Sequence, residues 1–513
     1  MKKSMLILLL LPLLVIALGG VSQAWQGRMA GMGDPYGLLA DESDFLIHPA
    51  KIAKGEGVRF YGYYRFTYTD VTDWDIDYAR YGSLAKASNL PGDELGHDAL
   101  AGAAFPLGPG RMGIFFTYEG RRDTFDGYVD DTANFLDEFK SDLDAFGLKF
   151  QYGIPVGGFR LGGEVGFAYR QEANEFFLYI PTLGLMNYRL LLLYPDDPLF
   201  GLLTPPVVPY DSAYWEIPFK AGVEGSVGPL DMEFTLRGGV IVSGDNTFAV
   251  EILQSPGGFN GFDLDGDVQG WRIGGDLWVR YPLGGGLSLP FLARVDYREK
   301  TRDGDGFYLN NPAVVLDYSN EETSLHLVVG GGLDKELAKG TRIAAGLYYA
   351  YLHDTGDCPF TFFDNGVLGD AEDYSDYPDF SEHRIIVHLA GEHAFSTAVA
   401  LRMGLEFFYG WPTQNLGWWG SDNVPLGRRI EDLSMEGSHW GIGASLGGSV
   451  RFNGFTLEPF VNAGYQSLDL SGDGSFYYQY NTGSILWSYP DMRDETRSEW
   501  SIGGGCAFLF DMP

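Results

Sequence analysis

The chain has 513 residues, with 69 Asp and Glu against 35 Lys and Arg, so its formal net charge is -34. So acidic a chain is not expected to bind nucleic acid, because the phosphate backbone repels it. The 72 glycines and an aromatic content of 15% accompany only two cysteines, so we expect no disulfide framework.

Residues 1–24 have the three parts of a secretory signal peptide. Lys2 and Lys3 precede the apolar run MLILLLLPLLVIALGG, and the small residues Ser22 and Ala24 precede the expected cleavage point. A membrane anchor is the alternative. Pro12 in the run and the lack of a basic cluster after it favour cleavage. We therefore expect an exported chain.

Residues 25–56 contain the stretch GMGDPYGLLADESDFLIHPAKIAKGE. It resembles the N-terminal segment of the long-chain fatty-acid transporter superfamily of outer-membrane barrels, which begins with a glycine motif, an acidic helix and Asn-Pro-Ala. In this chain His48 stands where that family usually has Asn, and Asp34-Pro35 replaces small residues.

The resemblance implies a hatch, meaning a short helical plug folded into the periplasmic mouth of a barrel. Leu38 and Phe45 can pack on a barrel wall, while the acidic residues can meet inward arginines. A periplasmic tail is the alternative. The hatch residues under this interpretation are Gly31, Met32, Gly33, Asp34, Asp41, Asp44, Pro49 and Ala50.

Residues 57–513 show long stretches of period-two alternation, which places one set of side chains on each face of a strand. In the stretch WRIGGDLWVRY, for example, Trp271, Ile273 and Leu277 alternate with Arg272 and Asp276. We expect strands of about ten to twelve residues, which suits a tilted strand that crosses a bilayer and exceeds the globular mean of about five or six.

The pattern predicts an all-β fold, a transmembrane antiparallel β-barrel of about sixteen strands (roughly 14–18). Short turns such as PVGG and Asn453-Gly454 alternate with long connections such as 173–213 and 412–437, which favours a barrel over a periplasmic sandwich. The short turns are expected on the periplasmic side and the long extracellular loops outside. We expect Cys506 to face lipid, Cys358 to lie in an outer loop, and both to be unpaired.

The inward-facing set is charged, and isolated charges cannot lie in a dry interior. A barrel this wide is not filled by its own side chains, so the lumen holds water, a plug or a partner. A ladder of ion pairs that stiffens the wall is the alternative. The predicted pore-lining residues are Arg59, Arg65, Arg160, Arg170, Arg237, Arg272, Arg280, Arg294, Arg298, Arg402, Glu164, Asp276, Asp296 and Glu406.

Two outer segments have unusual composition. Residues 173–213 are the most apolar outside the signal peptide, so we expect them to fold into the mouth or form a capture site, with a subunit contact as the alternative. Asp263, Asp265 and Asp267 have the spacing of the start of a calcium loop but lack its final glutamate. A solvated acidic surface is the alternative there.

No catalytic motif of the HExxH or GxSxG type occurs and no CxxCH haem motif, so we expect neither an enzyme nor a cofactor beyond loop-bound calcium. The sequence predicts a multi-pass, porin-like channel of the cell outer membrane for passive transport of small molecules, hydrophobic ones included. The expected partners are outer-membrane lipid, lipopolysaccharide and the cargo. The alternative is a structural sleeve around multihaem cytochromes in an electron conduit.

Overall fold

A computed structural model of the chain describes residues 48–80, 83–87, 92–129, 135–180, 184–187, 211–254, 258–308, 311–357, 360–364, 372–376, 379–421, 427–480 and 485–512. Within these ranges the helical element is η2, a 3-10 helix over Pro49–Lys54. No helix in the described ranges is long and apolar enough to span a membrane.

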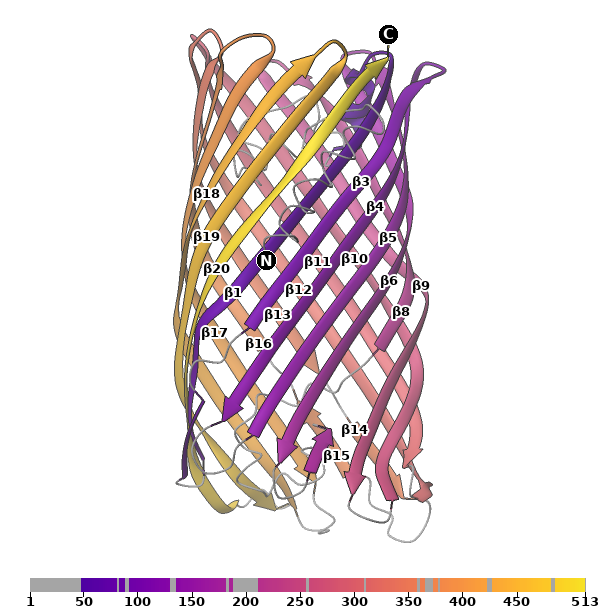
Figure 1. The fold of residues 1–513 in the computed structure, drawn as a ribbon, viewed down its shortest axis with the longest axis vertical. Coiled ribbons are helices and arrows are strands. Elements are labelled where there is room, and N and C mark those ends of the chain that lie inside the picture. Colours follow the sequence, from indigo (N-terminus) through magenta and orange to yellow (C-terminus); the bar gives the residue numbers. More distant parts are fainter. Residues whose placement is uncertain are drawn as a thin grey trace, which may run out of the picture.

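Sixteen long antiparallel strands in the described residues close into a barrel (Figure 1), as predicted. Each pairs with the next long strand, and β1 pairs with β20 from Val58–Met512 to Ala79–Met492, so the sheet has no open edge. The long strands are β1 (Val58–Arg80), β3 (Gly92–Leu107), β4 (Gly110–Val129), β5 (Phe135–Val156), β6 (Phe159–Ile180), β8 (Asp211–Val227), β9 (Leu230–Gln254), β10 (Gly258–Gly284), β11 (Leu287–Tyr308), β12 (Asn311–Ala338), β13 (Thr341–Asp357), β16 (Asp379–Ala394), β17 (Val399–Ser421), β18 (Gly427–Phe452), β19 (Phe455–Tyr480) and β20 (Ile485–Met512). Short strands β2 (Ser83–Ala87), β7 (Gly184–Asn187), β14 (Phe360–Asp364) and β15 (Glu372–Asp376) pair at the margins of the same sheet.

Tight turns join the strands at one end of the barrel, the end that also holds the C-terminus (Figure 1). Gly157 between β5 and β6 has φ +60°, and Gly454 between β18 and β19 has φ +73°. A positive φ is strained for residues with a Cβ, which explains glycine in these turns. The turns predicted at PVGG and Asn453-Gly454 are confirmed.

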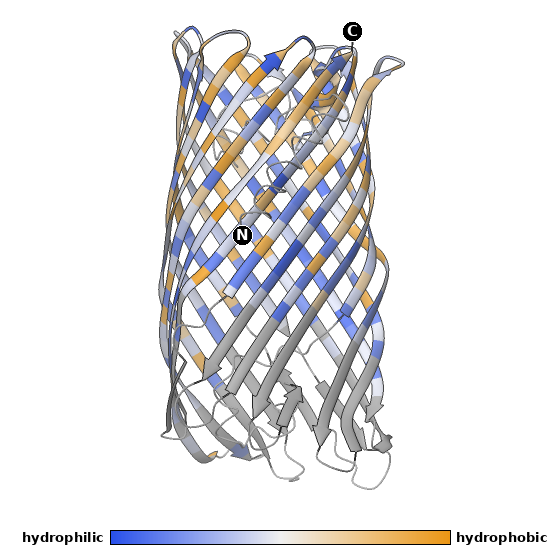
Figure 2. Ribbon diagram, in the orientation of Figure 1, coloured by the Kyte–Doolittle hydropathy of each residue, from blue (hydrophilic) through white to orange (hydrophobic). Residues whose placement is uncertain are grey.

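Starting near these turns, every second residue along a strand is apolar and faces outward. Together these residues form an apolar band on the outer face of the barrel. On β17, Leu401, Met403, Leu405 and Phe407 are 37 to 55% exposed. Figure 2 shows apolar residues concentrated toward the end with the tight turns. Such an exposed apolar surface is suited to lipid rather than water. Cys506 shares the outward register of Trp500 and Ile502 and is a free thiol, as predicted; Cys358 lies outside the described residues.

Aromatic pairs mark the far boundary of the band. Ring centroids lie 5.3 Å apart in Tyr169–Trp215 and 5.1 Å apart in Trp271–Tyr297. Along β6, the band from Phe159 to this boundary has the length of about nine to eleven residues that a tilted strand needs to cross a bilayer. The rings form the interfacial girdle of a membrane-spanning barrel.

The strands continue well beyond this girdle, so the predicted strand length of ten to twelve residues was wrong. β17 runs to Ser421 and β18 begins at Gly427, so most of the loop predicted over 412–437 is strand. Beyond the membrane the outer face meets water, so the apolar alternation stops while the backbone ladder continues. Apolar alternation alone therefore marks only the membrane-embedded part of each strand.

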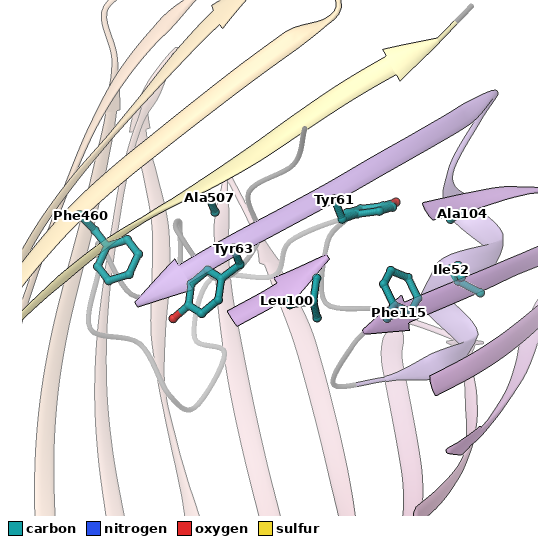
Figure 3. Packing of buried hydrophobic residues seen from close by; sticks show 8 residues of the cluster. All are labelled: Ile52, Tyr61, Tyr63, Leu100, Ala104, Phe115, Phe460 and Ala507. Atoms are coloured by element: carbon teal, nitrogen blue, oxygen red, sulfur yellow. The ribbon is translucent and has the colours of Figure 1, made fainter. Parts of the chain in front are cut away.

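Inside the barrel, at the end with the tight turns, aromatic and aliphatic side chains pack together. Ile52 of η2 belongs to one buried cluster with Tyr61, Leu100, Phe115 and Phe460 of the wall (Figure 3). This cluster attaches η2 to the inner face of the barrel.

Candidate functional site

The helix η2 lies inside the barrel near the tight turns. A Cβ on Gly162 of β6 would lie 2.3 Å from the Ala50 nitrogen, and one on Gly153 of β5 would lie 2.6 Å from Ile52 Cγ2. Both glycines are within a few residues of the β5–β6 turn. The absence of a side chain at these two wall positions is what lets the helix approach so closely. Ala50 is completely buried as a result.

Lysines of η2 form ion pairs with acids of the wall. Lys51 Nζ lies 2.8 Å from Glu233 Oε2, and Lys54 Nζ lies 2.5 Å from Glu224 Oε1. Arg160 contacts Glu224 as well, at 3.0 Å. The sequence suggested the reverse polarity, with hatch acids meeting wall arginines; in the described part of the segment the helix supplies the bases.

Of the predicted hatch residues, Pro49 and Ala50 lie in η2. Gly31, Met32, Gly33, Asp34, Asp41 and Asp44 lie outside the described residues.

His48 directly precedes η2 and is buried against β8 and β9. Its Nε2 lies 3.2 Å from the Val223 carbonyl oxygen and 3.1 Å from that of Phe234, so Nε2 carries the proton and donates. Burial, and then the charge of Lys51, lower the pKa of His48 to about 4. The imidazole is therefore neutral near pH 7.

Farther into the lumen lies a cavity of about 530 Å³ with a charged lining. Among the described residues, six basic side chains line it against four acidic ones. The basic residues are Arg65, Lys149, Arg170, Lys220, Arg237 and Arg272, and the acidic residues are Asp98, Glu119, Glu164 and Asp296. The structure thus brings together six of the predicted pore-lining residues, namely Arg65, Arg170, Arg237, Arg272, Glu164 and Asp296.

Ion pairs connect this lining to the wall behind it. Arg237 bridges Asp276 and Asp296, with 2.6 Å to the latter, and Arg294 lies 2.6 Å from Asp276. Arg272 lies 2.6 Å from Glu216, which is itself only 8% exposed. The two interpretations of the inward charges therefore hold together: the residues form a ladder of ion pairs, and part of that ladder faces an open cavity.

The remaining predicted pore-lining residues lie outside this cavity, and each arginine among them lies beside an acidic side chain. Arg160 and Arg59 lie near the tight turns, the latter 2.8 Å from Asp511. Arg280 lies 3.2 Å from Asp334, Arg298 lies 4.0 Å from Glu172, Arg402 lies 2.7 Å from Glu392, and Glu406 lies 3.7 Å from the ring of His388.

Sequence reasoning missed a buried contact that crosses the lumen. Glu172 of β6 lies 2.6 Å from Lys300 and 2.8 Å from Arg302 of β11, although β8, β9 and β10 separate these strands in the sheet. Lys300 and Arg302 are 2% and 1% exposed. Lys149 and Lys220 were missed as well, although the same alternation that identified Glu164 also places them inward.

The predicted calcium residues Asp263, Asp265 and Asp267 lie on strand β10 rather than in a loop. Successive members are one strand repeat apart, about 7 Å along the backbone, which differs from the backbone path of a calcium loop. Within the described ranges, no group of three or more His, Cys, Asp or Glu side chains is placed to hold a metal ion.

No protein-family model matches the chain. No curated protein matches its sequence. Among solved structures, it is similar to the Pseudomonas putida toluene transporter TodX, with 13% identity, 95% of this chain and 97% of that chain covered, and a TM-score of 0.38. It is also similar to a Pseudomonas aeruginosa FadL homologue, with 11% identity, 96% and 100% covered, and a TM-score of 0.39.

The closed sheet, the exposed apolar band and the aromatic girdle are features of the chain itself, independent of these likenesses. They are the features by which a barrel is held in an outer membrane, with lipid around it. The chain is an outer-membrane β-barrel that crosses the membrane with every long strand.

Proposed function

We propose that this protein is a passive outer-membrane channel for small molecules, and that the segment ending in η2 is its periplasmic hatch. The observation that carries the proposal is the docking of η2 within a closed barrel whose lumen also holds a charged cavity. Charged side chains around an open cavity keep water in it, because their desolvation would be costly. A water-filled lumen with a plug at one end is the arrangement of a gated pore.

The contacts of η2 are few enough to be broken without unfolding the barrel. It spans only six residues, and its contacts with the described wall include two ion pairs, the His48 hydrogen bonds and the packing of Ile52. The wall strands are closed by backbone pairing that does not involve η2. Release of the helix would therefore open the mouth while the barrel stays intact.

The proposed cargo is a small molecule. Hydrophobic cargo was expected from the apolar segment 173–213, of which residues 181–183 and 188–210 lie outside the described part of the chain. The described lumen favours polar cargo instead. The cytochrome sleeve gains no support from the described residues, because η2 and the cross-lumen contacts of Glu172 lie in the space that a chain of haems would need.

Two neighbouring glycines on β6 provide the test. Gly162 faces η2, whereas a Cβ on Gly163 would meet nothing closer than the Lys220 carbonyl oxygen at 3.9 Å. Gly162→Val in the full chain should displace the helix and raise ion conductance in planar lipid bilayers several-fold. Gly163→Val should leave it unchanged. Both should keep the heat-dependent electrophoretic mobility of a folded barrel.

Deletion of residues 31–54 should reproduce the effect of Gly162→Val. Equal, low conductance of the wild type, both glycine variants and the deletion would contradict the channel. High conductance of all of them would retain a pore but reject the hatch.

A further inference from the structure

We infer that the lumen cavity selects small organic anions, an inference that rests on the proposed channel function. The cavity lining is more basic than acidic, although the chain as a whole has a net charge of -34. A local surplus of positive charge in so acidic a protein needs a local cause. That cause lies in how the carboxylates of the wall are shared.

Lys149 is a cation of the lining that has no acidic partner among the described residues. It lies on β5 two residues from Gln151, which pairs with Glu164 of β6, and Glu164 pairs in turn with Lys220 of β8. Lys149, Glu164 and Lys220 all line the cavity. Glu164 is 1% exposed, lies 3.6 Å from Lys220 and accepts a hydrogen bond from Gln151. Within the described residues no ion pair joins Lys149 to an acid. Glu164 is therefore already engaged by Lys220 and Gln151.

The arginines extend past their acids into the cavity. Glu216 and Asp276 are each 8% exposed, whereas Arg272 and Arg237, which pair with them, are 45% and 23% exposed. Arg170 also lies 3.3 Å from Glu216 and 3.5 Å from Glu119. Glu216 and Asp276 are thus covered by their arginines, whereas Asp296 and Glu119 are 40% and 49% exposed and remain among the four acids of the lining. A solute in the cavity meets the guanidinium groups without meeting Glu216 or Asp276.

These groups match oxyanions in chemistry and the cavity matches a small molecule in size. Guanidinium groups offer paired donors to carboxylate or phosphate oxygens, and the lysine ammonium adds a point charge. A cavity of about 530 Å³ is in the range of small-ligand sites. Tyr63, Leu100 and Ala145 complete the wall with apolar surface, which favours an organic anion over an inorganic one.

Reversal potentials in planar bilayers under a tenfold KCl gradient test this inference. They are measured on the full chain and on the full chain with Gly162→Val, which supplies current if the wild type is closed. The expected result is selectivity for chloride over potassium. Lys149→Glu should shift the reversal potential toward potassium. Lys149→Gln, the variant to use if Lys149→Glu folds poorly, should shift it by about half as much.

Lys339→Glu is the matched control, because it changes net charge equally at the exposed turn between β12 and β13. It should leave the reversal potential unchanged. Replacing chloride with succinate or phosphate then separates the two oxyanion chemistries by their relative permeability. Succinate permeating better than phosphate supports an organic carboxylate, and the reverse supports a phosphate-bearing solute.

Failure of the anion inference and failure of the channel proposal would give different results. A conducting protein that prefers potassium, or in which Lys149→Glu and Lys339→Glu behave alike, overturns the anion inference and leaves the channel standing. A protein that stays silent with Gly162→Val overturns the channel, and the inference with it.

Discussion

His48 makes the docking of η2 depend on pH. Its ring lies between two wall carbonyl oxygens, with Lys51 of its own segment and Glu224 of β8 as the charged groups that act on it. Lys51 is in turn paired with Glu233 of β9. The pKa of His48 falls from 6.5 to about 4 on docking, so the undocked form binds more protons between these values. The docking free energy of η2 is therefore unaffected above pH 6.5 and becomes less favourable as pH falls toward 4. The total loss is on the order of 3 kcal/mol.

We predict that conductance of the full chain rises as pH is lowered from 7 to 4.5, because protonated His48 cannot stay between the carbonyls without a large desolvation cost. His48→Gln keeps an N–H donor but does not titrate, so its conductance should change much less over the same range. Planar-bilayer recordings at stepped pH provide the comparison. An identical pH response in the two proteins would assign the effect to other groups.

At the scale of elements, the contact between β6 and β11 ties two parts of the wall together across the lumen. Glu172 contacts Lys300 and Arg302, and both bases also contact Glu322 of β12. The bases are almost fully buried, so loss of one carboxylate leaves positive charge without sufficient compensation. The cluster is expected to hold the strands in register above the aromatic girdle.

Glu172→Gln should lower the free energy of unfolding by about 3 kcal/mol, near the lower limit for breaking a buried pair because Glu322 remains. Glu321→Gln, an exposed position on β12, should change it by less than about 0.5 kcal/mol. Urea-induced unfolding in lipid vesicles, followed by tryptophan fluorescence, measures both. A destabilisation of equal size in the two variants would refute a specific role for the buried cluster.

For the whole molecule, the apolar band determines how the barrel sits in the bilayer. Leu405 lies midway along the band on β17 and is 52% exposed. Leu405→Arg should destabilise the folded barrel by about 2–4 kcal/mol, as expected for a charge on the lipid face near the bilayer midplane.

Glu436→Arg is the matched control, because it also places an arginine on the outer face of the barrel. Glu436 is an exposed residue of β18 that lies beyond the apolar band. It should cost less than about 1 kcal/mol. Folding yield and urea unfolding in vesicles compare the two variants. A similar cost at both positions would place the bilayer boundary elsewhere on the barrel.

The sequence by itself determined the barrel, its sixteen strands, its tight turns and the outward identity of residues such as Leu401 and Ile273. These features depend on period-two alternation and turn chemistry, which are local and visible in a single chain. Only the tertiary structure decided which inward charges share a cavity, that Glu172 meets Arg302, and that Lys51 of the N-terminal segment meets Glu233. Those contacts join strands that are not neighbours in the sheet, or join the wall to a segment inside it. They depend on register, on closure and on the curvature of the wall, none of which leaves a local pattern in the sequence.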